Sequence, residues 1–198
     1  LRLHALVWNA GGRYRLEPEP LVVRRREVAV VVAGDRAATA LADVVVGLAR
    51  PVRGTVRLDD EDITELAPER RGVGLVPVDG GLLPHQSVER NIAVGRHDRI
   101  RPRKIAGELH LGDVLTAYPH ALSPAQRLQA AVARALCRRP EPDAIVIEDR
   151  TGRTPCRVAV ATALARDLAV LVITDDRDRV ATLGGPVHLA CPEAGDET

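Results

Sequence analysis

Residues 28–35 read Val-Ala-Val-Val-Val-Ala-Gly-Asp, an apolar run that stops at a glycine and a carboxylate. Continuous β-branched runs are typical of strands that are buried on both faces of a parallel sheet. Residues 37–49 follow with apolar side chains at helical spacing, and Pro51 and Gly54 end that segment. The run therefore predicts a central strand followed by a helix, which is the first unit of an α/β fold.

The rest of the chain continues this alternation of short apolar runs and amphipathic segments. We expect further strands at residues 55–58, 73–76, 144–147, 169–174 and 187–190. We expect further helices near residues 104–116, 126–138 and 158–168. This alternation indicates an α/β fold with a mostly parallel sheet, and 198 residues suit one domain or a closely coupled pair of subdomains.

The composition argues against several classes of function. A formal net charge of +1 predicts no strong attraction to nucleic acid or to an anionic membrane. Cys137, Cys156 and Cys191 form no CxxC pair, so neither a disulfide framework nor a zinc site is expected. The longest apolar run is far too short to span a bilayer, and no signal peptide is visible in a chain that begins with Leu1. Lys104 is the only lysine, which matters for any phosphate site of the usual kind.

Five segments, taken in order, carry a resemblance to a known family. They are residues 47–59 (GLARPVRGTVRLD), 62–76 (DITELAPERRGVGLV), 82–92 (LLPHQSVERNI), 119–127 (PHALSPAQR) and 145–149 (IVIED). Together they resemble the ATP-binding domains of ABC transporters, and most closely those of importer type. The resemblance covers roughly residues 27–176 of the chain.

The resemblance implies a P-loop NTPase-like fold, in which helices flank a mostly parallel sheet that carries an N-terminal antiparallel β part. It implies a single ABC ATPase-like domain over residues 1–198, with a core sheet subdomain (1–91 and 141–198) and a shortened helical subdomain (92–140). It also implies ATP and Mg²⁺ as cofactors. A membrane permease subunit and a second ABC ATPase-like subunit would be the partners, at the cytoplasmic, inner face of the cell membrane.

The phosphate-binding segment departs from the family pattern. Such a loop needs glycines whose amides wrap the phosphates, a lysine for the β- and γ-phosphates, and a hydroxyl for Mg²⁺. The corresponding residues here are Gly34, Asp35, Arg36, Ala37, Ala38, Thr39 and Ala40. The segment is one residue short, Ala37 replaces the closing glycine, Ala38 replaces the lysine, and Thr39 keeps the hydroxyl. Asp35 would repel a phosphate, and Arg36 would partly offset it. Two interpretations stay open, a capped helix start and a working phosphate site.

The acidic pair that follows the strand at residues 144–147 is inverted relative to the family. The family has an aspartate for the metal and then a glutamate for the attacking water, whereas this chain has Glu148 and then Asp149. Each carboxylate is therefore displaced by a methylene, and catalysis is sensitive to shifts of about 1 Å. The resemblance implies Glu148 and Asp149 as catalytic candidates, and Thr39 and Glu148 as Mg²⁺ ligands. A pair of acids at a strand end is also common without function.

Three further family positions lack their usual residues. Asp79 and Gly80 stand where the glutamine loop is expected, and Asp175 stands where the histidine is expected. Residues 151–155 do not match the segment that follows the acidic pair in the family. The groups that sense water and γ-phosphate are thus missing from the sequence.

The signature-like loop comprises Ser123, Pro124, Ala125 and Gln126. In the family its glycine amides approach the γ-phosphate of the partner subunit, but Pro124 has no amide hydrogen and Ala125 adds a Cβ. The alternative is structural: Ser123 caps a helix, Pro124 takes its first position, and Gln126 closes a capping box.

Tyr14 lies where the family places the aromatic residue that stacks on adenine, and Trp8 is the alternative. Either ring could instead be a packing residue. The sequence thus leaves two main functions open. One is a divergent ATP-binding subunit of an ABC-type transporter with impaired hydrolysis, and the other is a non-hydrolysing scaffold or regulatory partner of an intact ABC ATPase or permease. A decayed or unrelated α/β protein is a third reading.

Overall fold

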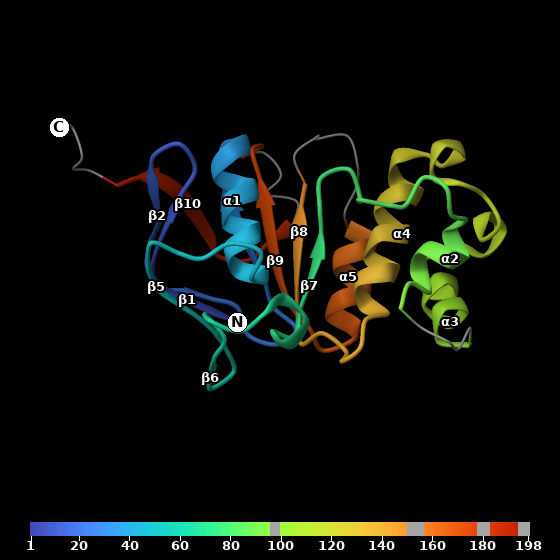
Figure 1. Ribbon diagram of the computed structural model, residues 1–198, viewed down its shortest axis with the longest axis horizontal. Coiled ribbons are helices and arrows are strands. Elements are labelled where there is room, and N and C mark those ends of the chain that lie inside the picture. Colours follow the sequence, from blue (N-terminus) through green and yellow to red (C-terminus); the bar gives the residue numbers. More distant parts are fainter. Residues whose placement is uncertain (96–99, 150–156, 178–182, 194–198) are drawn as a thin grey trace.

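The computed structural model describes residues 1–95, 100–149, 157–177 and 183–193. These residues form one mixed ten-stranded sheet with helices on both of its faces (Figure 1). The predicted α/β class and the predicted N-terminal antiparallel part are both confirmed. None of the described helices is long and apolar enough to cross a membrane.

The parallel part of the sheet holds the long apolar runs seen in the sequence. Its strands, in spatial order, are β10 (Val187–Pro192), β4 (Val28–Val32), β9 (Ala169–Thr174), β8 (Ala144–Glu148) and β7 (Val73–Val76). Each neighbouring pair is parallel, so the carboxyl ends of these strands meet at one edge. The sequence predicted these five strands to within two residues at each end.

The antiparallel part continues the same sheet. Its strands are β1 (Arg2–Asn9), β2 (Arg13–Glu17), β3 (Leu21–Val22), β5 (Arg53–Leu58) and β6 (Glu61–Asp62). Their order is β6-β5-β1-β2, β3 pairs with β1, and β2 joins the parallel part by pairing with β10. Apart from β5, the residue pattern did not predict these strands, and it missed β1 although that strand contains the apolar run at residues 5–8.

The helices lie close to the predicted segments, but their ends differ. They are α1 (Asp35–Val46), α2 (Val88–Ile92), α3 (Ile100–Glu108), α4 (Pro124–Leu136) and α5 (Arg157–Ala165), with 3-10 turns η1 (Pro68–Arg70), η2 (Gly112–Val114) and η3 (Pro119–Ala121). The helix expected at 104–116 is α3, which lies earlier and ends sooner because His110 adopts a left-handed φ of 55°. Likewise Asp167, at φ 67°, stops the chain from continuing α5 to residue 168.

Alternate residues of the buried strands belong to two hydrophobic clusters. On β4, Val28 and Val30 pack with the cluster that contains α4, whereas Ala29 and Val31 pack with the cluster that contains α1. The same alternation holds along β8 and β9. The sheet therefore separates two cores, and α1 lies on one face while α4 and α5 lie on the other (Figure 1).

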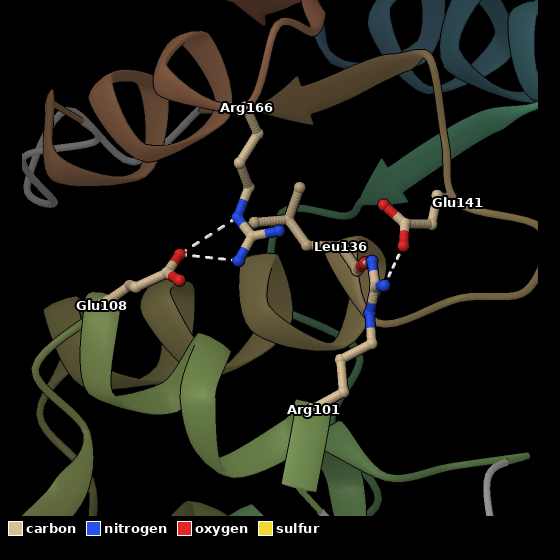
Figure 2. A network of polar contacts seen from close by, with 5 residues as sticks. All are labelled: Arg101, Glu108, Leu136, Glu141 and Arg166. Carbon is tan, nitrogen blue, oxygen red and sulfur yellow. Dashed lines mark hydrogen bonds and ion pairs between the residues drawn. The ribbon is translucent and has the colours of Figure 1, made fainter.

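The part of the chain that contains α2, α3 and α4 is joined to the sheet by apolar and by charged contacts. Its buried side chains share one cluster with those of β4, β7, β8 and β9. Arg166, in the turn directly after α5, donates to the carboxylate of Glu108 on α3 at 3.1 and 2.6 Å, and Arg101 pairs with Glu141 (Figure 2). The division at residues 92 and 140 into two subdomains stays a prediction.

Candidate functional site

The connection from β4 to α1 is the place where a phosphate loop would lie. Only Ala33 and Gly34 stand between the last residue of β4 and the first residue of α1. The amide of Ala33 donates to the Thr174 carbonyl at 2.9 Å, and the amide of Ala38 already donates to the Gly34 carbonyl at 2.9 Å. Backbone amides that wrap a phosphate need a longer loop before the helix begins. This connection therefore forms a direct strand-to-helix turn.

Gly34 occupies the N-cap of α1 with ordinary backbone angles, φ −67° and ψ 158°. It makes no side-chain cap hydrogen bond. The predicted helix is confirmed, but α1 begins at Asp35, two residues before the predicted start at residue 37. A Cβ at Gly34 would meet no atom within 4 Å, so neither the backbone angles nor the packing requires glycine there.

The residues of the predicted phosphate segment divide between the core and the surface. Ala37 is 3% exposed and Ala38 is fully buried, and both pack into the cluster under α1. Asp35, Arg36, Thr39 and Ala40 instead line a shallow pocket of about 440 Å³, together with Ala10 and Asp43. The position that corresponds to the family's lysine therefore lies in the core, outside this pocket.

Charge in this pocket opposes a phosphate. Asp35 and Asp43 each contribute a carboxylate, and burial raises the pKa of Asp43. Arg36 contributes the one positive side chain among the lining residues, and a Cβ at Gly11 would lie 3.7 Å from its guanidinium. Since the two carboxylates outnumber the guanidinium, a triphosphate would meet net repulsion there.

Trp8 and Tyr14 face each other across β1 and β2. Their rings stack with centroids 6.1 Å apart, and the Trp8 indole donates to the Ala37 carbonyl at 2.9 Å. Trp8 is fully buried, so the alternative that Trp8 stacks on adenine is wrong: its ring is a packing residue between the hairpin and α1. Tyr14 is half-buried and does not line the pocket beside Arg36. Its role toward adenine stays a prediction.

Glu148 and Asp149 lie at the carboxyl end of β8, and each is 4% exposed. Glu148 pairs in register with Ile173 of β9, and the Asp149 amide donates to the Ile173 carbonyl at 2.9 Å. Neither carboxylate lines the pocket that contains Thr39. Within the described residues no group of three or more His, Cys, Asp or Glu side chains is arranged to hold a metal ion. The Mg²⁺ pair Thr39 and Glu148 therefore stays a prediction.

The signature-like loop forms the capping box that the sequence allowed. The Ser123 hydroxyl accepts from the Gln126 amide at 3.2 Å, and the Gln126 side chain accepts from the Ser123 amide at 2.9 Å. Pro124 begins α4, directly after Ser123 at the N-cap. The structural interpretation is confirmed. The capping box occupies the backbone amides of Ser123 and Gln126 with hydrogen bonds inside the loop.

Other residues of the family-like segments also have structural contacts, which the sequence did not predict. Arg71 is 2% exposed, and its guanidinium donates to the carbonyls of Val44, Val45, Leu66 and Thr64. It thereby adds donors to carbonyl groups of the last turn of α1, where the Val44 carbonyl also accepts from the Gly47 amide at 3.3 Å. An arginine just before a buried strand was the only signal for this role.

Asn91 has a comparable role in the segment at residues 82–92. It is fully buried, accepts from the Leu83 amide at 2.7 Å, and donates to the carbonyls of Leu83, Gln86 and Ser87. One side chain therefore fixes the second half of the loop between β7 and α2, from Leu83 to Ser87.

The positions predicted to lack the family's glutamine and histidine show structural contacts or exposure to solvent. Arg134 of α4 donates to the carbonyls of Gly80 and Gly81, so the loop after β7 is bound to α4. Asp175 is exposed after β9. Residues 151–155, which follow the acidic pair, lie outside the described residues.

Comparisons with known proteins agree with this architecture. A family model described as "ABC transporter" matches residues 38–145. The molybdate/tungstate import ATP-binding protein WtpC of Archaeoglobus fulgidus is 45% identical over 105 residues, which are 50% of this chain and 43% of that protein. The putative 2-aminoethylphosphonate import ATP-binding protein PhnT of Salmonella paratyphi A is 27% identical over 195 residues, which are 90% of this chain and 52% of that protein. The chain thus spans about half the length of these curated relatives.

Solved structures show the same fold. A nucleotide-free ATP-binding cassette from an ABC transporter superposes with a TM-score of 0.78 at 18% identity, covering 96% of this chain and 86% of that one. The protein cbiO1 from Clostridium perfringens, part of an ABC transporter complex, superposes with a TM-score of 0.75 at 18% identity, covering 96% and 83%. The family model matches more than half of the chain, and on that ground the protein belongs to the ABC transporter family.

Proposed function

We propose that this chain is a non-hydrolysing subunit of an importer-type ABC assembly. It acts as a scaffold or regulatory partner of the subunit that hydrolyses ATP. The observation that carries the proposal is the two-residue connection between β4 and α1, with fully buried Ala38 in the lysine position. Without the loop and the lysine, the charge that develops on the phosphates during hydrolysis lacks its main stabilising groups.

The distribution of family-like residues supports the same proposal. The residues that match the family stabilise the fold: Arg71 satisfies carbonyls of α1, Asn91 fixes a loop, and Ser123 caps α4. The positions that differ from the family are those that would contact nucleotide. A scaffold needs the first group and not the second.

The relatives suggest the setting. WtpC and PhnT are named import ATP-binding proteins, and PotG of Escherichia coli, 25% identical over 96% of this chain, is named a putrescine transport ATP-binding protein. We infer by analogy a permease and a second ABC ATPase-like subunit as partners, at the inner face of the cell membrane. Co-purification of the chain with a membrane permease subunit would support this setting.

The second candidate, a divergent subunit that still binds ATP, rests on the pocket beside α1. Arg36 and Thr39 both line that pocket, and they offer one cation and one hydroxyl. Binding there would require these two groups to outweigh Asp35 and Asp43.

An equilibrium titration with a fluorescent ATP analogue and Mg²⁺ distinguishes the two candidates. For a non-hydrolysing scaffold we expect no saturable binding up to about 1 mM nucleotide. A dissociation constant of 1 mM corresponds to a binding free energy of only about 4 kcal/mol. Saturable binding at micromolar nucleotide that Arg36→Gln abolishes would favour the ATP-binding candidate. Arg90→Gln, on the distant helix α2, is the matched control for the loss of one positive charge.

A further inference from the structure

A second pocket lies on the antiparallel part of the sheet, and its volume is about 550 Å³. The exposed face of β1, β3 and β5 forms its floor, and its charged lining residues include Arg2, Arg24, Arg25, Arg57, Asp59 and Asp60. Figure 1 shows the N-terminus, which is part of this lining, beside β1 and β6 at the lower side of the molecule, whereas the parallel strands run toward the upper side. The pocket is therefore remote from the β4–α1 connection.

The strand register brings two of these arginines together. Arg2 of β1 stands directly opposite Arg57 of β5, and the next pair, Leu3 and Val56, is buried on the other face. Residues directly opposite in antiparallel strands share a face with their Cβ atoms about 5 Å apart, and like charges at such positions destabilise the pair. Arg2 and Arg57 are therefore neighbours on the face of the sheet opposite to Leu3 and Val56.

One carboxylate of the pocket already has an arginine partner. Arg25 donates to Asp59 at 2.9 Å and to Asp143 at 2.7 Å, so Asp59 is already paired at the rim. These two contacts hold the chain before β4, the β5–β6 turn and the chain before β8 together. They shape the pocket wall. Asp62 of β6 stands directly opposite Arg57 on its other side and interacts electrostatically with it, whereas no strand pair places a carboxylate opposite Arg2.

Arg57 donates to the backbone carbonyl of Asp60 at 2.6 Å, and no salt bridge to a carboxylate is found for it within the described residues. For Arg2, likewise, the described part of the chain shows no carboxylate within salt-bridge distance. Asp59 and Asp60 both line this pocket, and since Asp59 is paired with Arg25, the Asp60 carboxylate is the stronger source of repulsion for a bound anion.

We propose that this pocket binds a small phosphorylated molecule, whose phosphate is held between Arg2 and Arg57. Guanidinium groups suit phosphate because their planar donors match two oxygens at once. The pocket volume lies within the range of about 300–1,000 Å³ that is usual for small-molecule sites, so there is room for more than a bare phosphate. A bound phosphate places its negative charge between two guanidinium groups that otherwise repel each other. Binding therefore stabilises the fold, and it does so independently of any nucleotide at α1.

Calorimetric titration with pyrophosphate tests the proposal, with chloride adjusted to hold the ionic strength constant. We expect Arg2→Gln to weaken binding about tenfold or more, because one charged pair of hydrogen bonds is lost. Asp60→Asn should tighten binding, since it removes the opposing carboxylate from the same pocket. Arg90→Gln, an exposed arginine on α2, should bind as the original chain does.

The stability of the same variants gives a second, independent readout. Without pyrophosphate, Arg2→Gln should unfold at a higher urea concentration than the original chain, because the repulsion from Arg57 is removed. With pyrophosphate, it should gain less stability than the original chain gains. Equal pyrophosphate affinities of Arg2→Gln and the original chain would overturn the proposal. So would a loss of binding in Arg36→Gln, which would place the anion beside α1 instead.

Discussion

Arg71 shows how a charged side chain stabilises the fold without any nucleotide. Its guanidinium is almost fully buried and is shared among four backbone carbonyls, two of which belong to α1. Burial lowers the pKa of Arg71, but its donors are all directed at backbone acceptors. Arg71 therefore links the end of α1 to the segment before β7.

We expect Arg71→Ala to lower the free energy of unfolding by more than about 3 kcal/mol, because several charge-assisted hydrogen bonds are lost and buried carbonyls are left unsatisfied. Urea unfolding followed by circular dichroism measures this loss. Arg70→Ala is the matched control, since the Arg70 side chain is exposed on η1 and its removal should change stability by less than about 0.5 kcal/mol. Equal losses in the two variants would contradict the structural role of Arg71.

Asp62 gives the fold a pH dependence. Its carboxylate accepts from the Thr64 hydroxyl at 2.6 Å and from the Thr64 amide at 3.0 Å, and these hydrogen bonds lower the pKa of Asp62. A carboxylate with a lowered folded-state pKa stabilises the fold above its unfolded pKa of about 3.9, and this contribution is lost as the pH falls through the folded value.

Asp62→Asn should therefore be less stable than the original chain at pH 7, and the difference should shrink below about pH 4. Urea midpoints measured at both pH values check this, with Glu61→Gln as the control for removing an exposed carboxylate of the same strand. A difference between Asp62→Asn and the original chain that is the same at both pH values would contradict the assignment.

At the scale of elements, the start of α4 tests the structural interpretation of the signature-like loop. Ser123→Ala removes the side-chain acceptor of the capping box and should cost about 1 kcal/mol of stability without any nucleotide present. Ser123→Asp should restore most of it, because aspartate also caps helices well. Chemical unfolding measures both, and an unchanged stability of Ser123→Ala would show that the cap contributes nothing.

The ion pair between Glu108 and Arg166 joins α3 to the turn that connects α5 to β9 (Figure 2). The side chains of Arg166 and Glu108 are 23% and 37% exposed, so solvent screens the pair only in part. A double-mutant cycle with Glu108→Gln and Arg166→Gln should give a coupling energy of about 1 kcal/mol. The same cycle at Arg50 and Glu65, which are 79% and 67% exposed, should give a value near zero. A zero coupling at the first pair would mean that the salt bridge does not hold α3.

The elements with strong periodicity could be predicted from the sequence, whereas several helix ends could not. β4, β9 and α4 carry long apolar runs or stripes, and each was predicted close to its observed position. α3 ends near His110, which adopts positive φ although it is not a glycine, so the sequence gives no signal for that turn. The short strands β2 and β3 pair with β10 and β1, which are distant from them in sequence, and local patterns do not reveal such pairs.

At the scale of the whole molecule, the candidate site was predicted only in outline. The missing lysine was visible in the sequence, but the length of the β4–α1 connection and the burial of Ala38 depend on how the strand and the helix pack. The burial of Trp8 likewise depends on the β1–β2 hairpin folding against α1. The length of this connection and the burial of both side chains follow from tertiary packing. A comparison with the family's sequence motifs shows only which residues differ.

The rate of phosphate release from Mg²⁺–ATP by the purified chain tests the central claim most directly. We expect no release above the protein-free background, and the same result for Glu148→Ala. Ala38→Lys should not restore activity, because the new ammonium group would have to enter the core beneath α1, where burying a charge costs several kcal/mol. Steady turnover by the original chain that Glu148→Ala or Asp149→Ala abolishes would contradict the account.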